Sequence, residues 1–192
     1  MEIKIAATCQ DWLPQVIIRL LTSADLPALE WDGEFRHFRR VYAQAYERSL
    51  HGYVILWVAE LPGTGVIGQV FIQLISDRLE VADGLRRAYL YSFRVRSAFR
   101  QAGLGSRMLA FVEEDLKQRG FEYITLNVAK ENEGALRLYL RQGYKIVGED
   151  PGCWSYPDEN GIWHQVEEPS WRMQKHLWDT RKTLDGKPPR YT

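Results

Sequence analysis

The chain has 192 residues, which suits one domain and is long enough to bury a substantial core. Hydrophobic residues make up 45% and charged residues 26%, a balance that excludes a natively disordered chain. The 25 basic and 25 acidic residues cancel, so the net charge gives no reason to expect nucleic acid or an anionic membrane as a partner.

The two cysteines, Cys9 and Cys153, lie far apart and form no C-x-x-C pair, so we expect neither a disulfide framework nor a metal site. Residues 1–10 lack the long apolar segment of a signal peptide. No stretch approaches the roughly 20 apolar residues that span a bilayer. These features predict a cytoplasmic protein with no membrane partner.

The hydrophobic patterning predicts more strands than helices. The first half begins with a strand at 16–21, a helix start at 22–25 capped by Thr22 or Ser23, and a helix at 35–50. It continues with a hairpin of strands at 53–59 and 66–75, a loop at 77–87 and a strand at 89–95. The second half is a helix at 104–116, a strand at 123–128, a helix at 133–142, a strand at 145–148, a hairpin at 154–156 and 162–166, and a strand at 170–177. We therefore predict one α+β domain over residues 1–178 and a loosely ordered tail over 179–192.

The strongest local signal is a glycine-rich turn between the strand that ends near Val95 and the helix at 104–116. It reads Arg100-Gln101-Ala102-Gly103-Leu104-Gly105-Ser106. Glycines let the backbone turn tightly, and the first amides of the next helix have no partner inside it, so a pyrophosphate fits there. Ser106-Arg107 excludes a P-loop, and Met108 stands where a dinucleotide fingerprint needs a small residue. The alternative is an ordinary turn between two packed elements.

A second segment places Tyr139 on a short helix that follows Asn132. A tyrosine with its ordinary pKa of about 10 is protonated at neutral pH and can donate a proton to a leaving thiolate. The alternative is a packing aromatic with a solvated hydroxyl.

Taken together, the two segments resemble the GNAT superfamily of N-acetyltransferases. The first motif of that family matches at Val95, Arg100, Gly103 and Gly105, and the second matches at Asn132, Ala135, Tyr139, Gly143 and Tyr144. The flanking strands also fit the family order, so the resemblance covers most of the chain. It implies an α+β, three-layer fold with a mixed, mostly antiparallel sheet of about seven strands and helices on both faces. The sheet would splay between the strands that end near Val95 and Val128.

The resemblance implies transfer of the acetyl group of acetyl-CoA to a primary amine of a small molecule or protein, by direct attack through a tetrahedral intermediate and without a metal. Val95 would polarise the acetyl carbonyl through its N–H group, and Tyr139 would be the general acid. The implied cofactor-binding residues are Phe93, Val95, Arg100, Gln101, Ala102, Gly103, Leu104, Gly105, Ser106, Asn132 and Tyr139.

The sequence departs from the family in one place. Many relatives carry a carboxylate on the strand of Val95, but here Arg94 is the only charged residue between Ala88 and Val95. The base could be Glu34, Glu60 or a water chain, or the amine could arrive already neutral. The missing carboxylate also motivates a second hypothesis, a non-catalytic CoA-binding regulatory module, and a different acyl donor such as succinyl-CoA is a third.

The aromatic segment 154–168 is longer than a minimal version of this fold requires. It carries Trp154, Tyr156, Trp163 and His164. It could wall the acceptor cleft, form a homodimer interface or simply pack a sheet edge.

Overall fold

The structure, a computed structural model, describes residues 12–178. Residues 1–11 and 179–192 lie outside the described residues. The predicted absence of a signal peptide, the predicted loosely ordered tail and Cys9 therefore fall outside them as well.

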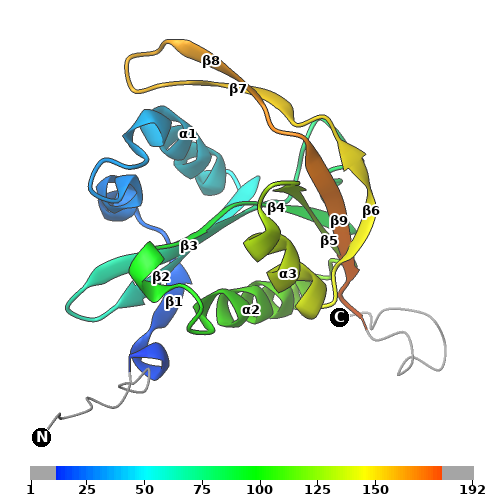
Figure 1. The fold of residues 1–192 in the computed structure, drawn as a ribbon, viewed down its shortest axis with the longest axis horizontal. Helices are drawn as coiled ribbons and strands as arrows, with labels where there is room; N and C mark the ends of the chain where they lie inside the picture. The colour runs from blue at the N-terminus through cyan, green and yellow to red at the C-terminus, as the bar shows by residue number, and fades with distance from the viewer. Residues whose placement is uncertain (1–11, 179–192) are drawn as a thin grey trace, which may run out of the picture.

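A seven-stranded sheet forms the centre of the molecule, in the order β1-β2-β3-β4-β5-β9-β6 (Figure 1). The strands are β1 (Ile17–Leu20), β2 (Val54–Leu61), β3 (Gly65–Gln73), β4 (Arg87–Val95), β5 (Tyr123–Ala129), β6 (Lys145–Asp150) and β9 (Ser170–His176). Only β4 and β5 pair in parallel, and every other neighbouring pair is antiparallel. The predicted mixed, mostly antiparallel sheet is confirmed.

Helices cover both faces of the sheet (Figure 1), as the resemblance implied. On one face α1 (Arg39–Leu50) and the 3-10 helix η2 (Ser23–Glu30) contribute Tyr42, Ala45 and Leu29 to a core against β2 and β3. On the other face α2 (Leu104–Gln118) and α3 (Glu133–Arg141) build a second core. Three short 3-10 helices connect these elements: η1 (Leu13–Gln15), η3 (Arg36–Phe38) and η4 (Ser97–Phe99).

The amphipathic pattern explains why α2 packs where it does. Its buried apolar residues recur at helical spacing on one face, at Leu104, Met108, Leu109, Val112 and Leu116, whereas Phe111 on another face is exposed. The helix ends at Gln118, and Gly120 follows with a positive φ of 87°, a conformation that glycine adopts without steric cost.

The first predicted helix differs from its prediction. Thr22 is the N-cap and forms a capping box with Asp25, but the segment that follows is 3-10 rather than α. Pro27 lies inside it and cannot donate a backbone hydrogen bond, which disfavours a continuous α-helix. The next predicted helix likewise starts later, at Arg39, after η3.

The aromatic hairpin of β7 (Cys153–Pro157) and β8 (Trp163–Glu167) forms a separate two-stranded sheet that arches over α1 (Figure 1). Gly152 lies at the base of the hairpin with a φ of +69°. A Cβ at this position would lie 1.8 Å from the Glu168 carbonyl oxygen, so only glycine fits there. Cys153 is an exposed free thiol. Among the residues described, no helix has both the length and the apolarity to cross a bilayer.

Replacing Leu109 by alanine should lower the free energy of unfolding by about 2–5 kcal/mol, because it leaves a cavity under the sheet. Leu109 is 0% exposed. Leu85 is the matched control, since it is 78% exposed and its change to alanine should cost almost nothing. Urea denaturation checks this, and equal losses in the two variants would contradict the assigned core.

Candidate functional site

The central sheet opens between β4 and β5. The two strands pair only from Arg87 with Tyr123 to Leu90 with Leu126. Beyond these pairs β4 runs on to Val95 beside β3, and β5 runs on to Ala129 beside β9. The predicted splay is therefore confirmed: β4 and β5 stop pairing partway along their length, in the middle of the sheet.

A β-bulge lies where the strands part. Tyr91 pairs with Phe71 and Arg94 pairs with Gln69, so Ser92 and Phe93 together oppose the single residue Val70. Ser92 has a φ of +52°, in the left-handed region that a non-glycine residue seldom adopts. A bulge bends its strand and increases its twist, which turns β4 away from β5.

The backbone of Val95 faces this gap. Val95 pairs with Gly68, and the flanking Arg96 amide donates to the Ile67 carbonyl. This is the non-hydrogen-bonded position of an antiparallel ladder, at which a residue directs its own N–H and C=O away from the partner strand. The Val95 carbonyl accepts a 2.8 Å hydrogen bond from Arg100 Nε on that side. The Val95 amide shares the edge and faces no neighbouring strand.

The start of α2 lies next to the gap. Gln101 (φ +58°) and Gly103 (φ +91°) are both in the left-handed region, and they fold the turn tightly before the helix starts at Leu104. Within residues 12–178 none of the amides from Gln101 to Ser106 donates a hydrogen bond to protein, and Gly103 provides no side-chain cap. These unpartnered donors lie at the positive end of the helix dipole, which favours an anion.

Side chains from three elements meet beside the turn. A Cβ on Gly105 would lie 3.3 Å from Leu138 and 3.7 Å from the Phe93 ring, so only glycine allows this approach without displacement. Gln142 Nε2 donates a 3.2 Å hydrogen bond to Ser106 Oγ, which joins the end of α3 to the start of α2. The segments that carry the two motifs are thus brought together.

Tyr139 faces the same region from α3. Its ring lies 6.5 Å from Phe93 and 5.4 Å from Tyr144, centroid to centroid, and the residue is 6% exposed. Burial raises the pKa of Tyr139 well above that of a free tyrosine, so the phenol is protonated at neutral pH. The hydroxyl makes no hydrogen bond in the described chain and is not fully buried.

Asn132 has a structural role that the motif alone did not indicate. It is the N-cap of α3, and its side-chain oxygen accepts a 3.1 Å hydrogen bond from the Ala135 amide. Its contact with a cofactor arm stays a prediction.

The opposite face of β4 carries Arg94. Its Nη1 donates to Tyr42 Oη at 2.9 Å and to Ser92 Oγ at 3.0 Å. The guanidinium carbon lies over the Phe35 and Phe38 rings, at 4.3 and 5.0 Å from their centroids. Sequence reasoning noted Arg94 only as the charge that stands where a carboxylate was expected, and it did not assign this residue to the site.

The β7–β8 hairpin covers the aromatic group formed by Phe35 and Phe38. Phe38 packs against Tyr156 at 4.7 Å and Trp154 at 6.1 Å between ring centroids. The hairpin therefore packs on the N-terminal end of α1, and its role as an acceptor wall or a homodimer interface stays a prediction.

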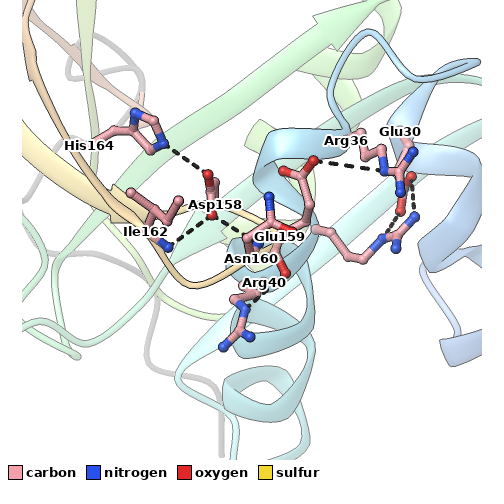
Figure 2. Close-up of polar contacts among 9 residues, drawn as sticks. Glu30, Arg36, Arg40, Asp158, Glu159, Asn160, Ile162 and His164 are labelled. Carbon is pink, nitrogen blue, oxygen red and sulfur yellow. Dashed lines mark hydrogen bonds and ion pairs between the residues drawn. The ribbon is translucent and has the colours of Figure 1, made fainter.

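The tip of the hairpin is fastened to η3 and α1 (Figure 2). Asp158 organises the turn by accepting hydrogen bonds from the Asn160 and Ile162 amides, both within 2.9 Å, and it pairs with His164 at 3.0 Å. Arg40 Nε donates to the Glu159 carbonyl at 3.3 Å, and Arg36 approaches the Glu159 carboxylate at 3.8 Å (Figure 2).

Glu60 and Glu34, the two carboxylates considered as general bases, differ in their ion pairing. Glu60 accepts a 2.6 Å hydrogen bond from Arg19 and lies on β2, two strands from β4. Glu34 is exposed, forms no ion pair in the described chain, and acts on Arg94 through its charge.

These features define an α+β fold whose sheet splays between two parallel strands, beside a helix start whose first amides have no partner within residues 12–178. The family model for the acetyltransferase (GNAT) family matches residues 19–144. The chain belongs to this family.

Individual relatives are more distant. The chain is 37% identical over 62 residues to the uncharacterized N-acetyltransferase YdgE of Bacillus subtilis, covering 32% of this chain and 40% of that protein. It is 28% identical over 133 residues to the probable N-acetyltransferase 14 of Xenopus tropicalis, covering 69% and 58% of the two chains. The chain thus spans about half the length of these curated relatives.

A solved structure shares the fold over nearly its whole length. This is yncA, a putative acetyltransferase from Salmonella typhimurium solved with its cofactor acetyl-CoA. It superposes with a TM-score of 0.62 at 17% identity, covering 85% of this chain and 95% of that chain.

The capping role of Asn132 can be tested by stability. Asn132→Ala should lower the free energy of unfolding by about 1 kcal/mol, because the Ala135 amide loses its acceptor. Asn132→Asp keeps an acceptor oxygen at the N-cap and should retain the parent stability. Thermal and urea unfolding measure both, and an alanine variant as stable as the parent would refute the cap.

Proposed function

We propose that this protein is an N-acetyltransferase that moves the acetyl group of acetyl-CoA to a primary amine. The observation that carries the proposal is the gap between β4 and β5, with the Val95 amide on its edge and the bare amides of Gln101 to Ser106 at its mouth. Family membership and the acetyl-CoA in the Salmonella structure support the choice of ligand.

The residues fit CoA in three respects. The amides of Gln101 to Ser106 offer a row of donors at a helix N-terminus, which suits a pyrophosphate. Glycine at position 105 lets Phe93 and Leu138 approach the turn closely and narrows the slot beside it. The free edge of β4 offers strand-like pairing to the amide-bearing pantetheine arm. Arg100 is exposed and holds the Val95 carbonyl, so it would move aside or contact phosphate when the arm pairs there.

When bound, the thioester supplies the activated acetyl group. The Val95 amide points into the gap and would stabilise the negative charge that develops on the acetyl oxygen. Tyr139 would hold a proton at its hydroxyl and deliver it to the departing thiolate, since burial keeps the phenol protonated. Asn132 would support the arm indirectly by fixing the start of α3.

The acceptor would enter from the face of β4 that carries Arg94, because the turn and Tyr139, which would hold CoA, lie on the face of Phe93. Glu60 is held by Arg19, which leaves Glu34 or water to take the amine proton. A small-molecule amine and a protein amine both remain within the proposal. A cytoplasmic location and a homodimer stay predictions from the sequence.

The amide cradle can be tested by deleting one donor. Ser106→Pro removes an N–H that the protein does not use, and proline is tolerated in the first turn of a helix. The loss of one hydrogen bond to a charged group should weaken CoA binding about tenfold or more. Isothermal titration calorimetry measures the dissociation constant.

Ser106→Ala is the matched control, because it removes only the hydroxyl that accepts from Gln142 and keeps the amide. We expect its CoA affinity to stay within about threefold of the parent. Equal affinities for the proline and alanine variants would contradict the cradle.

The acid role of Tyr139 can be tested by kinetics. Tyr139→Phe should lower kcat by about a hundredfold or more while CoA affinity is retained. Tyr144→Phe changes a neighbouring buried tyrosine and should leave kcat near the parent value. The assay is thiol release from acetyl-CoA over a broad amine panel.

The outcomes separate the two main hypotheses. Thiol release that depends on the amine and on Tyr139 supports the enzyme. Tight CoA binding with no turnover on the whole panel would support the regulatory module instead. An unchanged kcat in Tyr139→Phe would assign the proton to water.

A further inference from the structure

Arg94 is a largely buried cation that forms no ion pair with any residue from 12 to 178. Burial lowers the pKa of its guanidinium, yet arginine keeps its charge in proteins. Glu34 and Glu168 act on it through their charges, but both are exposed and neither forms an ion pair with it. A desolvated charge without a partner is costly. The contacts over Phe35 and Phe38 offset only part of that cost.

One nitrogen of the Arg94 guanidinium is held by hydrogen bonds, and the other two are not. Nη1 is fixed by Tyr42 and Ser92, whereas Nε and Nη2 donate no hydrogen bond in the part of the chain described. Neither of these two nitrogens is fully buried. An arginine that presents a fixed, free edge of N–H donors has the geometry that binds a planar oxyanion through two hydrogen bonds.

The arginine is held in place from beneath. Gln69, which is 0% exposed, donates from Nε2 to the Ser92 carbonyl at 3.3 Å and to Ser92 Oγ at 3.4 Å. Ser92 Oγ in turn accepts from Arg94. The bulge that opens the sheet therefore also orients the guanidinium.

Arg94 also lies beside the reacting position. It precedes Val95, the residue whose amide faces the gap, and consecutive Cα atoms lie about 3.8 Å apart. Its side chain projects on the face opposite Phe93, toward the aromatic group roofed by the hairpin. An amine that approaches the gap from this face passes the free edge of Arg94.

We propose that the acetyl acceptor carries an oxyanion close to its amine, a carboxylate or a phosphate, and that Arg94 binds this group and sets acceptor specificity. The inference rests on the proposed function, because it assigns the acceptor of the same site.

Matched acceptor pairs test the inference. Each pair shares the amine and differs in the anion: L-phenylalanine and L-phenylalaninol, γ-aminobutyrate and its amino alcohol, and O-phosphoethanolamine and ethanolamine. We expect the anionic member of at least one pair to have a kcat/KM about tenfold or more above its neutral partner. The first two pairs report a carboxylate and the third reports a phosphate.

Variants then assign the preference to the side chain. Arg94→Gln should remove the preference by lowering kcat/KM for the anionic member about tenfold or more, with the neutral member changed little. Arg94→Lys keeps the charge but loses the fork, so it should restore part of the preference. Arg119→Gln, an exposed change at the far end of α2, is the control and should behave as the parent. If Arg94→Gln does not fold, the parent pairs and the lysine variant still decide the question.

A binding arm requires no turnover. For each of the two carboxylate pairs, the N-acetylated amino acid and the N-acetylated amino alcohol are titrated separately into the CoA-loaded protein by calorimetry. The N-acetylated amino acid should bind about tenfold more tightly. Selective binding without thiol release from any amine would overturn the proposed activity and leave the anion site standing. Turnover of neutral amines as fast as anionic ones, with a parallel loss of both in Arg94→Gln, would overturn the inference and show a purely structural arginine.

Discussion

The parting of β4 from β5 after Leu90 and Leu126 is the constraint on which the rest of the site depends. A sheet normally satisfies its buried backbone groups by pairing neighbouring strands, and an interrupted pair leaves donors and acceptors that need partners. Here the interruption follows a bulge at Ser92 and Phe93, and both strands stay anchored on their outer sides by β3 and β9. The gap is therefore held open by the sheet itself.

The same strand separates two kinds of chemistry. On one face, Phe93 lies against the turn and Tyr139, beside a helix start whose amides attract anions. On the other face, Arg94 lies among aromatic rings under the β7–β8 hairpin. Side chains alternate along a strand, so the side chains of neighbouring residues lie on opposite faces of the sheet. The backbone amide of Val95 lies between these two faces, at the edge of the strand. In the proposed reaction the two substrates meet at this amide.

The sequence predicted the features that depend on residues close together in the chain. Glycines at 103 and 105 and the apolar period of residues 104–116 indicated a turn and a helix start, and the structure has both. The mixed, mostly antiparallel sheet of about seven strands and its splay followed from the resemblance of the two motifs to a known family. The first predicted helix was wrong in its geometry, because a proline within it favours a 3-10 helix, whereas Thr22, one of its two predicted caps, is the N-cap.

The residues that sequence reasoning did not find depend on distant contacts. Serine is an unusual residue at positive φ, so nothing in the pattern marks Ser92 as the bulge. Arg94 meets Tyr42, which lies 52 positions earlier, and rings that the hairpin then covers. The one available signal was that Arg94 is the only charged residue between Ala88 and Val95. A single sequence does not state which segments pack across a sheet, so these partners needed the structure.

The most direct measurement is a nitrogen-15 NMR titration of the full chain with CoA, which reports each backbone amide separately. We expect the largest shifts, and slowed hydrogen exchange, at the amides of Gln101 to Ser106 and at Val95, with small changes along β1 and β2. Shifts confined to other surfaces, or unaltered exchange at Val95 and the α2 turn under saturating CoA, would contradict the claim that the parted strands and the bare helix start form one binding slot.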